Sequence, residues 1–166
     1  MHPVELAALR EYTAALLREG LLSFGDRQVS RRFGRYNEPI SRFLQTRLAP
    51  LMSAVTGRAV LPTFSFLFCY ASGAELKPHT DRREAEYSIS LQVDYAPEPS
   101  PGAATPWPLG FQLADGTAVL TDLRLGDAVL YHGAELVHFR EPLPEGHRSA
   151  QLILEYVPAD FEGPRI

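Results

Sequence analysis

The chain has 166 residues, of which 45% are hydrophobic and 22% are charged, an ordinary composition for one globular domain. A formal net charge of −4 argues against sequence-independent binding to nucleic acid, because such binding needs many Lys and Arg contacts to phosphates. No apolar run reaches the roughly 18 residues of a membrane span, and no signal-peptide pattern is visible. These features predict a cytoplasmic protein without nucleic-acid or membrane partners.

The first third of the chain predicts two helices. Residues 3–19 and 38–56 repeat apolar positions every three or four residues, and a glycine follows each segment. Asn37 is the expected N-cap of the second helix, and Pro50 is expected to kink or divide it. Residues 21–37 predict a surface loop. That loop carries an arginine cluster typical of a solvated segment, with contact to an anionic substrate as the alternative: Arg27, Arg31, Arg32 and Arg35.

From residue 60 onward the pattern changes to strands. The segment 86–95 alternates apolar and polar residues, and Asp115-Gly116 indicates a hairpin. The proline-rich segment 96–108 predicts a loop, in which Trp107 either covers a pocket or anchors the core. The single cysteine, Cys69, is expected to be a buried apolar residue. The predicted strands are 61–71, 86–95, 109–113, 117–121, 128–132, 136–140 and 148–157.

Two helices followed by strands with short turns predict a mainly β protein with flanking α structure. The expected architecture is a jelly roll or barrel with the N-terminal helices packed outside. We expect a single domain made of helices and a loop in residues 1–58, a β core in residues 59–157 and a loose tail in residues 158–166.

A candidate metal site comes from His79 and Asp81. In an extended segment, residues two positions apart project to the same side, so both side chains would point into one space. A second histidine would complete the two-histidine, one-carboxylate arrangement of non-heme Fe(II) oxygenases. His138 is preferred over His132, which lies just before Gly133. The alternative for His79 and Asp81 is a surface pair that shares a loop.

The motif His79-x-Asp81, followed by His138 and then by Arg148 ten positions later, resembles the Fe(II)- and 2-oxoglutarate-dependent dioxygenases. The prolyl-4-hydroxylase-like branch is the most similar, and the resemblance covers about residues 60 to 157. Three flanking segments contribute to it: Tyr-Ala-Ser-Gly at 70–73, Leu-Gly-Asp-Ala at 125–128 and His-Phe-Arg-Glu at 138–141.

The resemblance implies a double-stranded β-helix (jelly roll, cupin-like) fold. It also implies Fe(II) held by His79, Asp81 and His138, with 2-oxoglutarate and O₂ as cosubstrates. The expected reaction is hydroxylation of an unactivated C–H bond with release of succinate and CO₂. Asp81 argues against a halogenase, because halogenases of this superfamily lack the carboxylate ligand.

The far carboxylate of 2-oxoglutarate requires a cation, and the planar fork of arginine can grip it with two hydrogen bonds. Arg148 is the preferred anchor. Arg140 is a rival, because alternation places it on the same side of its strand as His138. Tyr70 is expected either to hydrogen-bond the cosubstrate or to be a core tyrosine. The serine often found two positions after the family's basic residue is replaced by Ala150, so the second anchor is left open.

Two other functions are compatible with these residues: a cupin-like metalloenzyme that does not use 2-oxoglutarate, and a non-catalytic barrel that binds a metal or ligand. The spacing of Arg148 argues against the first, and the complete set of candidate ligands argues against the second. The substrate is expected to be a small molecule or a peptide, contacted by the loops at residues 27–36 and 96–108. Its identity and the oligomeric state are not encoded in these patterns.

Overall fold

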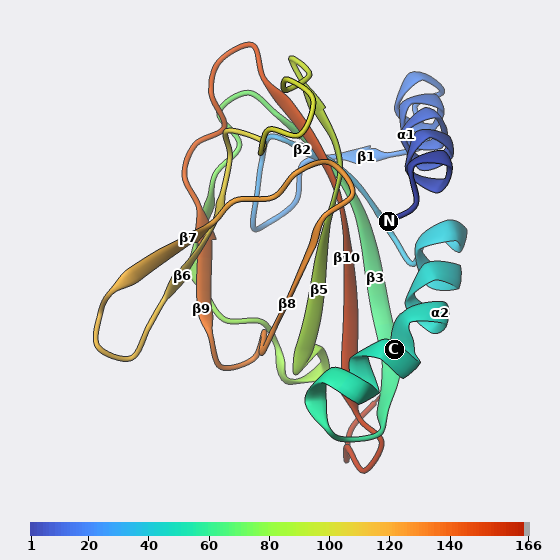
Figure 1. Ribbon diagram of the computed structural model, residues 1–166, viewed down its shortest axis with the longest axis vertical. Helices are drawn as coiled ribbons and strands as arrows, with labels where there is room; N and C mark the ends of the chain where they lie inside the picture. Colours follow the sequence, from blue (N-terminus) through green and yellow to red (C-terminus); the bar gives the residue numbers. More distant parts are fainter. Residues whose placement is uncertain (165–166) are drawn as a thin grey trace.

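The computed structural model describes residues 1–164 (Figure 1). Two α-helices, α1 (Pro3–Arg18) and α2 (Pro39–Thr56), and one short 3₁₀ helix (Arg83–Ala85) accompany the strands. The strands are β1 (Ser23–Phe24), β2 (Arg32–Tyr36), β3 (Val60–Ala71), β4 (Leu76–His79), β5 (Tyr87–Ala96), β6 (Leu109–Gln112), β7 (Ala118–Thr121), β8 (Ala128–Tyr131), β9 (Val137–Arg140) and β10 (Arg148–Pro158).

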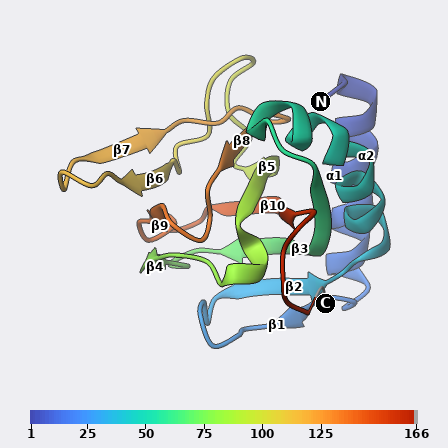
Figure 2. The same cartoon turned by 90° about the horizontal axis from the view of Figure 1, so that it is seen from below.

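The strands form two antiparallel sheets that face each other across the barrel interior (Figure 2). The six-stranded sheet has the order β1-β2-β3-β10-β5-β8, and the four-stranded sheet has the order β4-β9-β6-β7. This arrangement is the predicted jelly-roll double-stranded β-helix, and the prediction of a mainly β fold with flanking helices is confirmed.

Both helices cover the outer face of the six-stranded sheet, as Figures 1 and 2 show. Their apolar residues Leu9, Leu16 and Met52 pack against alternate residues of the sheet, including Leu152 and Leu154. A buried amide, Gln45, ties α2 to the sheet by donating to the backbone carbonyls of Phe64 and Glu155. The expected packing of the helices outside the barrel is therefore observed.

The opposite face of the same sheet points into the barrel, and the part of it formed by β5 and β10 is largely polar. On β5, Ser88, Ser90 and Gln92 face inward, and all three are at most 2% exposed. A bulge between the residue pairs Ala150–Asp94 and Gln151–Gln92 then changes the alternation. Beyond it, Asp94 lies on the helix side and pairs with Arg10 of α1. The alternating segment 86–95 is thus a strand with two buried faces of different chemistry.

Three local expectations differ from the structure. The segment 21–37 is not all loop: β2 pairs with β3 and extends the large sheet, although its sequence, Arg-Phe-Gly-Arg-Tyr, lacks a regular apolar pattern. Glu38, not Asn37, caps α2, because its carboxylate accepts hydrogen bonds from the amides of Ile40 and Ser41. Of the two outcomes expected at Pro50, division of the helix is not observed, because α2 continues through this residue as one element.

The C-terminal tail predicted at 158–166 is held over its first residues, since the amide of Ala159 donates to the carbonyl of Ala59 and Asp160 pairs with Arg58. Its last two residues lie outside the described part of the chain. Within residues 1–164, neither helix has the length and apolar character needed to cross a bilayer.

Candidate metal centre

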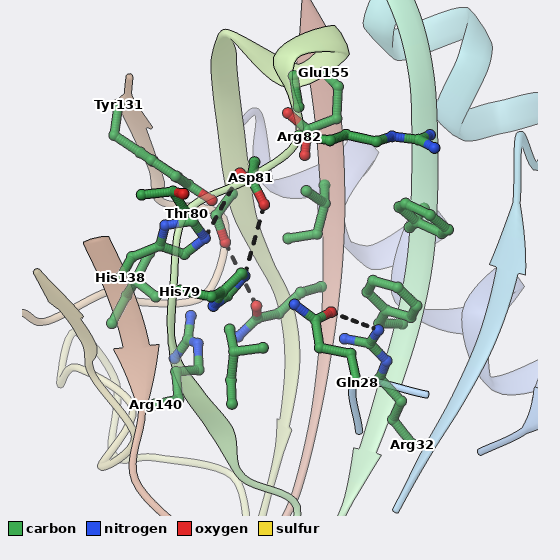
Figure 3. Close-up of a pocket in the computed structure, with 18 of the residues that line it drawn as sticks. Gln28, Arg32, His79, Thr80, Asp81, Arg82, Tyr131, His138, Arg140 and Glu155 are labelled. Carbon is green, nitrogen blue, oxygen red and sulfur yellow. Dashed lines mark hydrogen bonds and ion pairs between the residues drawn. The ribbon is translucent and has the colours of Figure 1, made fainter. Parts of the chain in front are cut away.

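Strand pairing brings His79, Asp81 and His138 together at the mouth of the barrel (Figure 3). His79 on β4 and His138 on β9 are direct cross-strand neighbours. The Nε2 atoms of the two histidines each lie 3.6 Å from one carboxylate oxygen of Asp81. One ligand atom from each residue lies within 4.8 Å of the others, which is close enough for one metal ion. The alternative of an unrelated surface pair does not describe this geometry.

Both histidines present the same ring nitrogen to the centre. Nδ1 of His79 lies 2.9 Å from the carbonyl of Lys77, and Nδ1 of His138 lies 3.0 Å from the carbonyl of Leu136. A carbonyl only accepts hydrogen bonds, so each Nδ1 carries the hydrogen and each Nε2 keeps a free lone pair. Outer contacts of this kind orient histidine ligands in metal sites.

The pKa values of the two imidazoles are shifted in opposite directions. Burial lowers the pKa of His138, which favours the neutral ring that a metal requires. Burial also acts to lower the pKa of His79, but the nearby Asp81 carboxylate and the contact with the Lys77 carbonyl outweigh it and raise that pKa. The raised pKa favours the protonated ring of His79, which would have to release that proton to bind a metal.

Gly133, which precedes β9, lies directly against Asp81. The amide of Asp81 donates to the Gly133 carbonyl at 2.8 Å. A Cβ atom on Gly133 would come within 2.5 Å of Asp81 Oδ2 and would also collide with Ser88 Oγ. A glycine is required here for space, and not only to end a strand.

Arg140 lines the same cavity. It follows His138 by two residues on β9, so the two side chains project from the same side of the strand. It is 2% exposed, its Nη1 donates to the carbonyl of Trp107, and its guanidinium carbon lies 4.6 Å from the centre of the Trp107 ring. Its Nη2 is buried and has no hydrogen-bond partner among residues 1–164. Burial lowers the pKa of Arg140 to about 10, so the group remains cationic at neutral pH.

Arg148 does not enter this cavity. It is exposed at the start of β10 and shares a small outer pocket with Cys69 and Asp94. Alternation along the strand explains this orientation. Arg148 projects to the same side of β10 as Ala150 and Leu152, which pack on the helix side of the sheet. The preferred anchor for a carboxylate thus points away from the candidate ligands, and its rival Arg140 points toward them.

The cavity has a volume of about 530 Å³ and continues from the candidate ligands along an aromatic wall. Alternate inward residues of β2 and β3 form this wall: Tyr36, Phe64, Phe66, Phe68 and Tyr70. Arg32 lies over Phe68 with its guanidinium carbon 3.7 Å from the ring centre, and it donates to the Tyr70 hydroxyl at 3.3 Å. Arg82 lies over Phe64 at 3.9 Å.

Several residues close to the candidate ligands were not singled out from the sequence. Ser88 and Glu155 bring a hydroxyl and a carboxyl group close to Asp81, and Tyr131 packs its ring 4.9 Å from that of His138. The inward alternation of β5 was a signal for Ser88, but nothing local marked Glu155. Among the four clustered arginines only Arg32 is buried; the other three are exposed. His132 lies away from the centre, against Tyr87 and Glu86.

Comparison with known proteins supports the fold. No protein-family model matches the chain, and no curated protein matches its sequence. Among solved structures, a Pseudomonas putida prolyl-4-hydroxylase is 20% identical, with 94% of this chain and 88% of that chain covered at a TM-score of 0.68.

Two further solved structures are similar to the chain. SnoN, a non-heme alpha ketoglutarate dependent epimerase from nogalamycin biosynthesis, is 16% identical, with 96% and 75% coverage and a TM-score of 0.75. HygX from Streptomyces hygroscopicus, solved with nickel, 2-oxoglutarate and hygromycin B bound, is 14% identical, with 97% and 81% coverage and a TM-score of 0.69. The chain therefore has the fold of Fe(II)/2-oxoglutarate-dependent oxygenases, as the motif resemblance predicted.

Proposed function

We propose that the protein is an Fe(II)- and 2-oxoglutarate-dependent oxygenase that hydroxylates an unactivated C–H bond. The observation that carries the proposal is the combination, in one cavity, of two histidines and a carboxylate with a buried, partly unpaired arginine. The first group matches the ligand set of non-heme iron oxygenases. The second offers a charge-assisted hydrogen bond to an organic anion.

In this function His79, Asp81 and His138 hold Fe(II). Three protein ligands would leave the metal accessible to a 2-oxo acid and O₂, and the bound cofactors would supply the oxidising chemistry. The residues of the chain orient the reactants, and the walls of the cavity exclude water. The residues fit these cofactors, because two Nε2 lone pairs and a carboxylate converge while an N–H of Arg140 is left unpaired.

Arg140 is the proposed anchor for the far carboxylate of 2-oxoglutarate. Tyr70 is the proposed second anchor: its hydroxyl accepts from Arg32, which leaves its own hydrogen free to donate to a carboxylate. Both residues line the cavity, and Arg148 lies on the other side of the sheet. This assignment replaces the one favoured by motif spacing.

The substrate, a small molecule or a peptide, would bind at the open end of the cavity. Arg82 is exposed there above Phe64, and Tyr36 is 42% exposed at the end of the aromatic wall. These residues offer stacking surfaces and one cation close to the candidate metal ligands. Hydroxylation is proposed as the reaction because the prolyl-4-hydroxylase-like motif is the most similar one.

The test is an anaerobic titration of metal-free protein with Fe(II) and then 2-oxoglutarate, followed by absorption spectroscopy. The proposal predicts a weak visible charge-transfer band that needs both additions and fades when air is admitted. Arg140→Gln should raise the Kd for 2-oxoglutarate about 30-fold or more, from the roughly 2 kcal/mol minimum cost of truncating a buried charged pair. Arg148→Gln is the matched control and should leave that Kd unchanged.

Each other outcome has a defined meaning. Metal binding without the band would favour a cupin-like metalloenzyme that does not use 2-oxoglutarate. Failure to bind metal would favour a non-catalytic barrel. If Arg148→Gln weakened 2-oxoglutarate binding and Arg140→Gln did not, the anchor assignment would be wrong.

A further inference from the structure

Glu155 is a carboxyl group inside the barrel to which the proposed chemistry assigns no role. It lies on β10, is 3% exposed and lines the same cavity as the candidate ligands (Figure 3). It is the direct cross-strand neighbour of Ser88 on β5. A buried carboxyl group is costly unless it is hydrogen-bonded, so its contacts indicate why it is there.

The hydroxyl of Ser88 stands between two carboxyl groups. Its Oγ lies 2.5 Å from Glu155 Oε2 and 3.2 Å from Asp81 Oδ2. A serine hydroxyl has one hydrogen and can donate to only one of them. For both contacts to be hydrogen bonds, one carboxyl group must supply the other hydrogen. A carboxyl group must be deprotonated to bind a metal, and Asp81 is the candidate ligand, so Glu155 is the group that can supply the hydrogen.

The surroundings of Glu155 favour a hydrogen bond donated from Glu155 to Ser88. Burial, and after it the nearby Asp81 carboxylate, raises the pKa of Glu155 well above its usual value. The Ser88 hydroxyl, and after it Arg82, act in the opposite direction on that pKa without outweighing burial, and Arg82 is exposed and stacks on Phe64. Gly133 packs against both Ser88 and Asp81, and a methyl group at this position would collide with both side chains.

We propose that Glu155 is a positioning residue that stays protonated and orients Asp81 through Ser88. The acid O–H of Glu155 donates to Ser88 Oγ, and the Ser88 hydroxyl donates to Asp81 Oδ2. With the Asp81 amide fixed to Gly133, this relay restricts the rotation of the carboxylate before a metal binds. The inference rests on the proposed function only for the role of Asp81 as a metal ligand.

The experiment measures anaerobic Co(II) binding to the full chain by its visible ligand-field absorption, with metal-free melting temperatures recorded beside it. Ser88→Ala and Glu155→Ala should each weaken Co(II) binding about 10–100-fold, the usual effect of removing an outer partner of a metal ligand. Glu155→Gln should keep near wild-type affinity, because its amide N–H also donates to Ser88. Ser90→Ala makes the same chemical change at the next inward position of β5 and should leave the affinity unchanged.

An infrared spectrum of the Co(II)-loaded protein at neutral pH supplies a signature that packing alone does not produce. A carbonyl stretch of a protonated carboxylic acid should be present in the wild type and absent in Glu155→Gln. The proposal is overturned if that band is missing, if Glu155→Gln binds Co(II) as poorly as Glu155→Ala, or if Ser88→Ala binds it as the wild type does. A wild-type chain that binds no metal would instead contradict the proposed function.

Discussion

The two faces of strand β10 are both buried, but one presents mainly apolar side chains and the other mainly polar ones. Leu152 and Leu154 face the helices and are 0% exposed, whereas Gln151 and Glu155 face the barrel interior and are at most 3% exposed. The outer face gains stability from apolar burial. The inner face must satisfy its polar groups within itself, and it surrounds the candidate ligands. Burial alone therefore does not distinguish the stabilising face from the functional one.

The largest expected effect comes from removing an inner ligand. Asp81→Ala should lose Co(II) and Fe(II) binding by more than the roughly 10–100-fold caused by loss of an outer partner. The metal-free melting temperature should hardly fall, because the substitution also removes the cost of holding the Asp81 carboxylate in a largely buried site. Calorimetric titration and thermal unfolding measure the two quantities. Retention of metal binding would contradict the assignment of Asp81, and His79→Ala provides an independent check.

An outer-face truncation should behave in the opposite way. Leu152→Ala removes a fully buried side chain beneath the helices and should cost about 2–5 kcal/mol of unfolding free energy. Denaturant unfolding measures the loss. Below the melting temperature, the Kd for Co(II) should equal the wild-type value. A selective loss of metal affinity in this variant would show that the two faces are coupled.

Gly133→Ala should affect both properties to a smaller extent. The added methyl group would collide with Asp81 Oδ2 and Ser88 Oγ, so metal affinity should fall. Overpacking of this kind costs about 1–3 kcal/mol, less than the upper range for Leu152→Ala. Gly146→Ala is the control for substitution of a glycine, since its added methyl group meets no atom within 4 Å. That control should lose some stability through its positive φ of 77° and keep its metal affinity.

The smallest effect concerns the ion pair that holds Arg32 over the aromatic wall. Burial acts to raise the pKa of Asp26, but hydrogen bonds from Arg32 and from the amides of Val29 and Gln28 outweigh it and lower that pKa. A lowered carboxyl pKa stabilises the folded state above about pH 4, and this contribution is lost as pH falls through the folded-state pKa. Asp26→Asn should therefore melt slightly below the wild type at pH 7, and the difference should shrink toward pH 3. A constant difference would contradict the ion-pair origin.

Local patterns were sufficient for much of the architecture. The helices, the hairpin at Asp115-Gly116 and the long strands follow from periodicity and turn residues, and the confirmed jelly-roll fold follows from their order. The relation between His138 and Arg140 was also within reach, because two residues apart on one strand always share a side. Strand β2 was missed, because its stability comes from pairing with β3 and not from its own sequence.

Which side of a strand faces the cavity depended on contacts across the chain. Spacing alone favoured Arg148, but a single position reverses the direction of a side chain, and the pairing of β10 with β3 and β5 turns Arg148 outward. The meeting of Ser88, Glu155 and Asp81 likewise requires strand pairing and the space left by Gly133. By itself the sequence determined the elements and the ligand motif, because both are local. Only the tertiary structure decided which polar groups share the interior, because register and burial depend on partners far away in the chain.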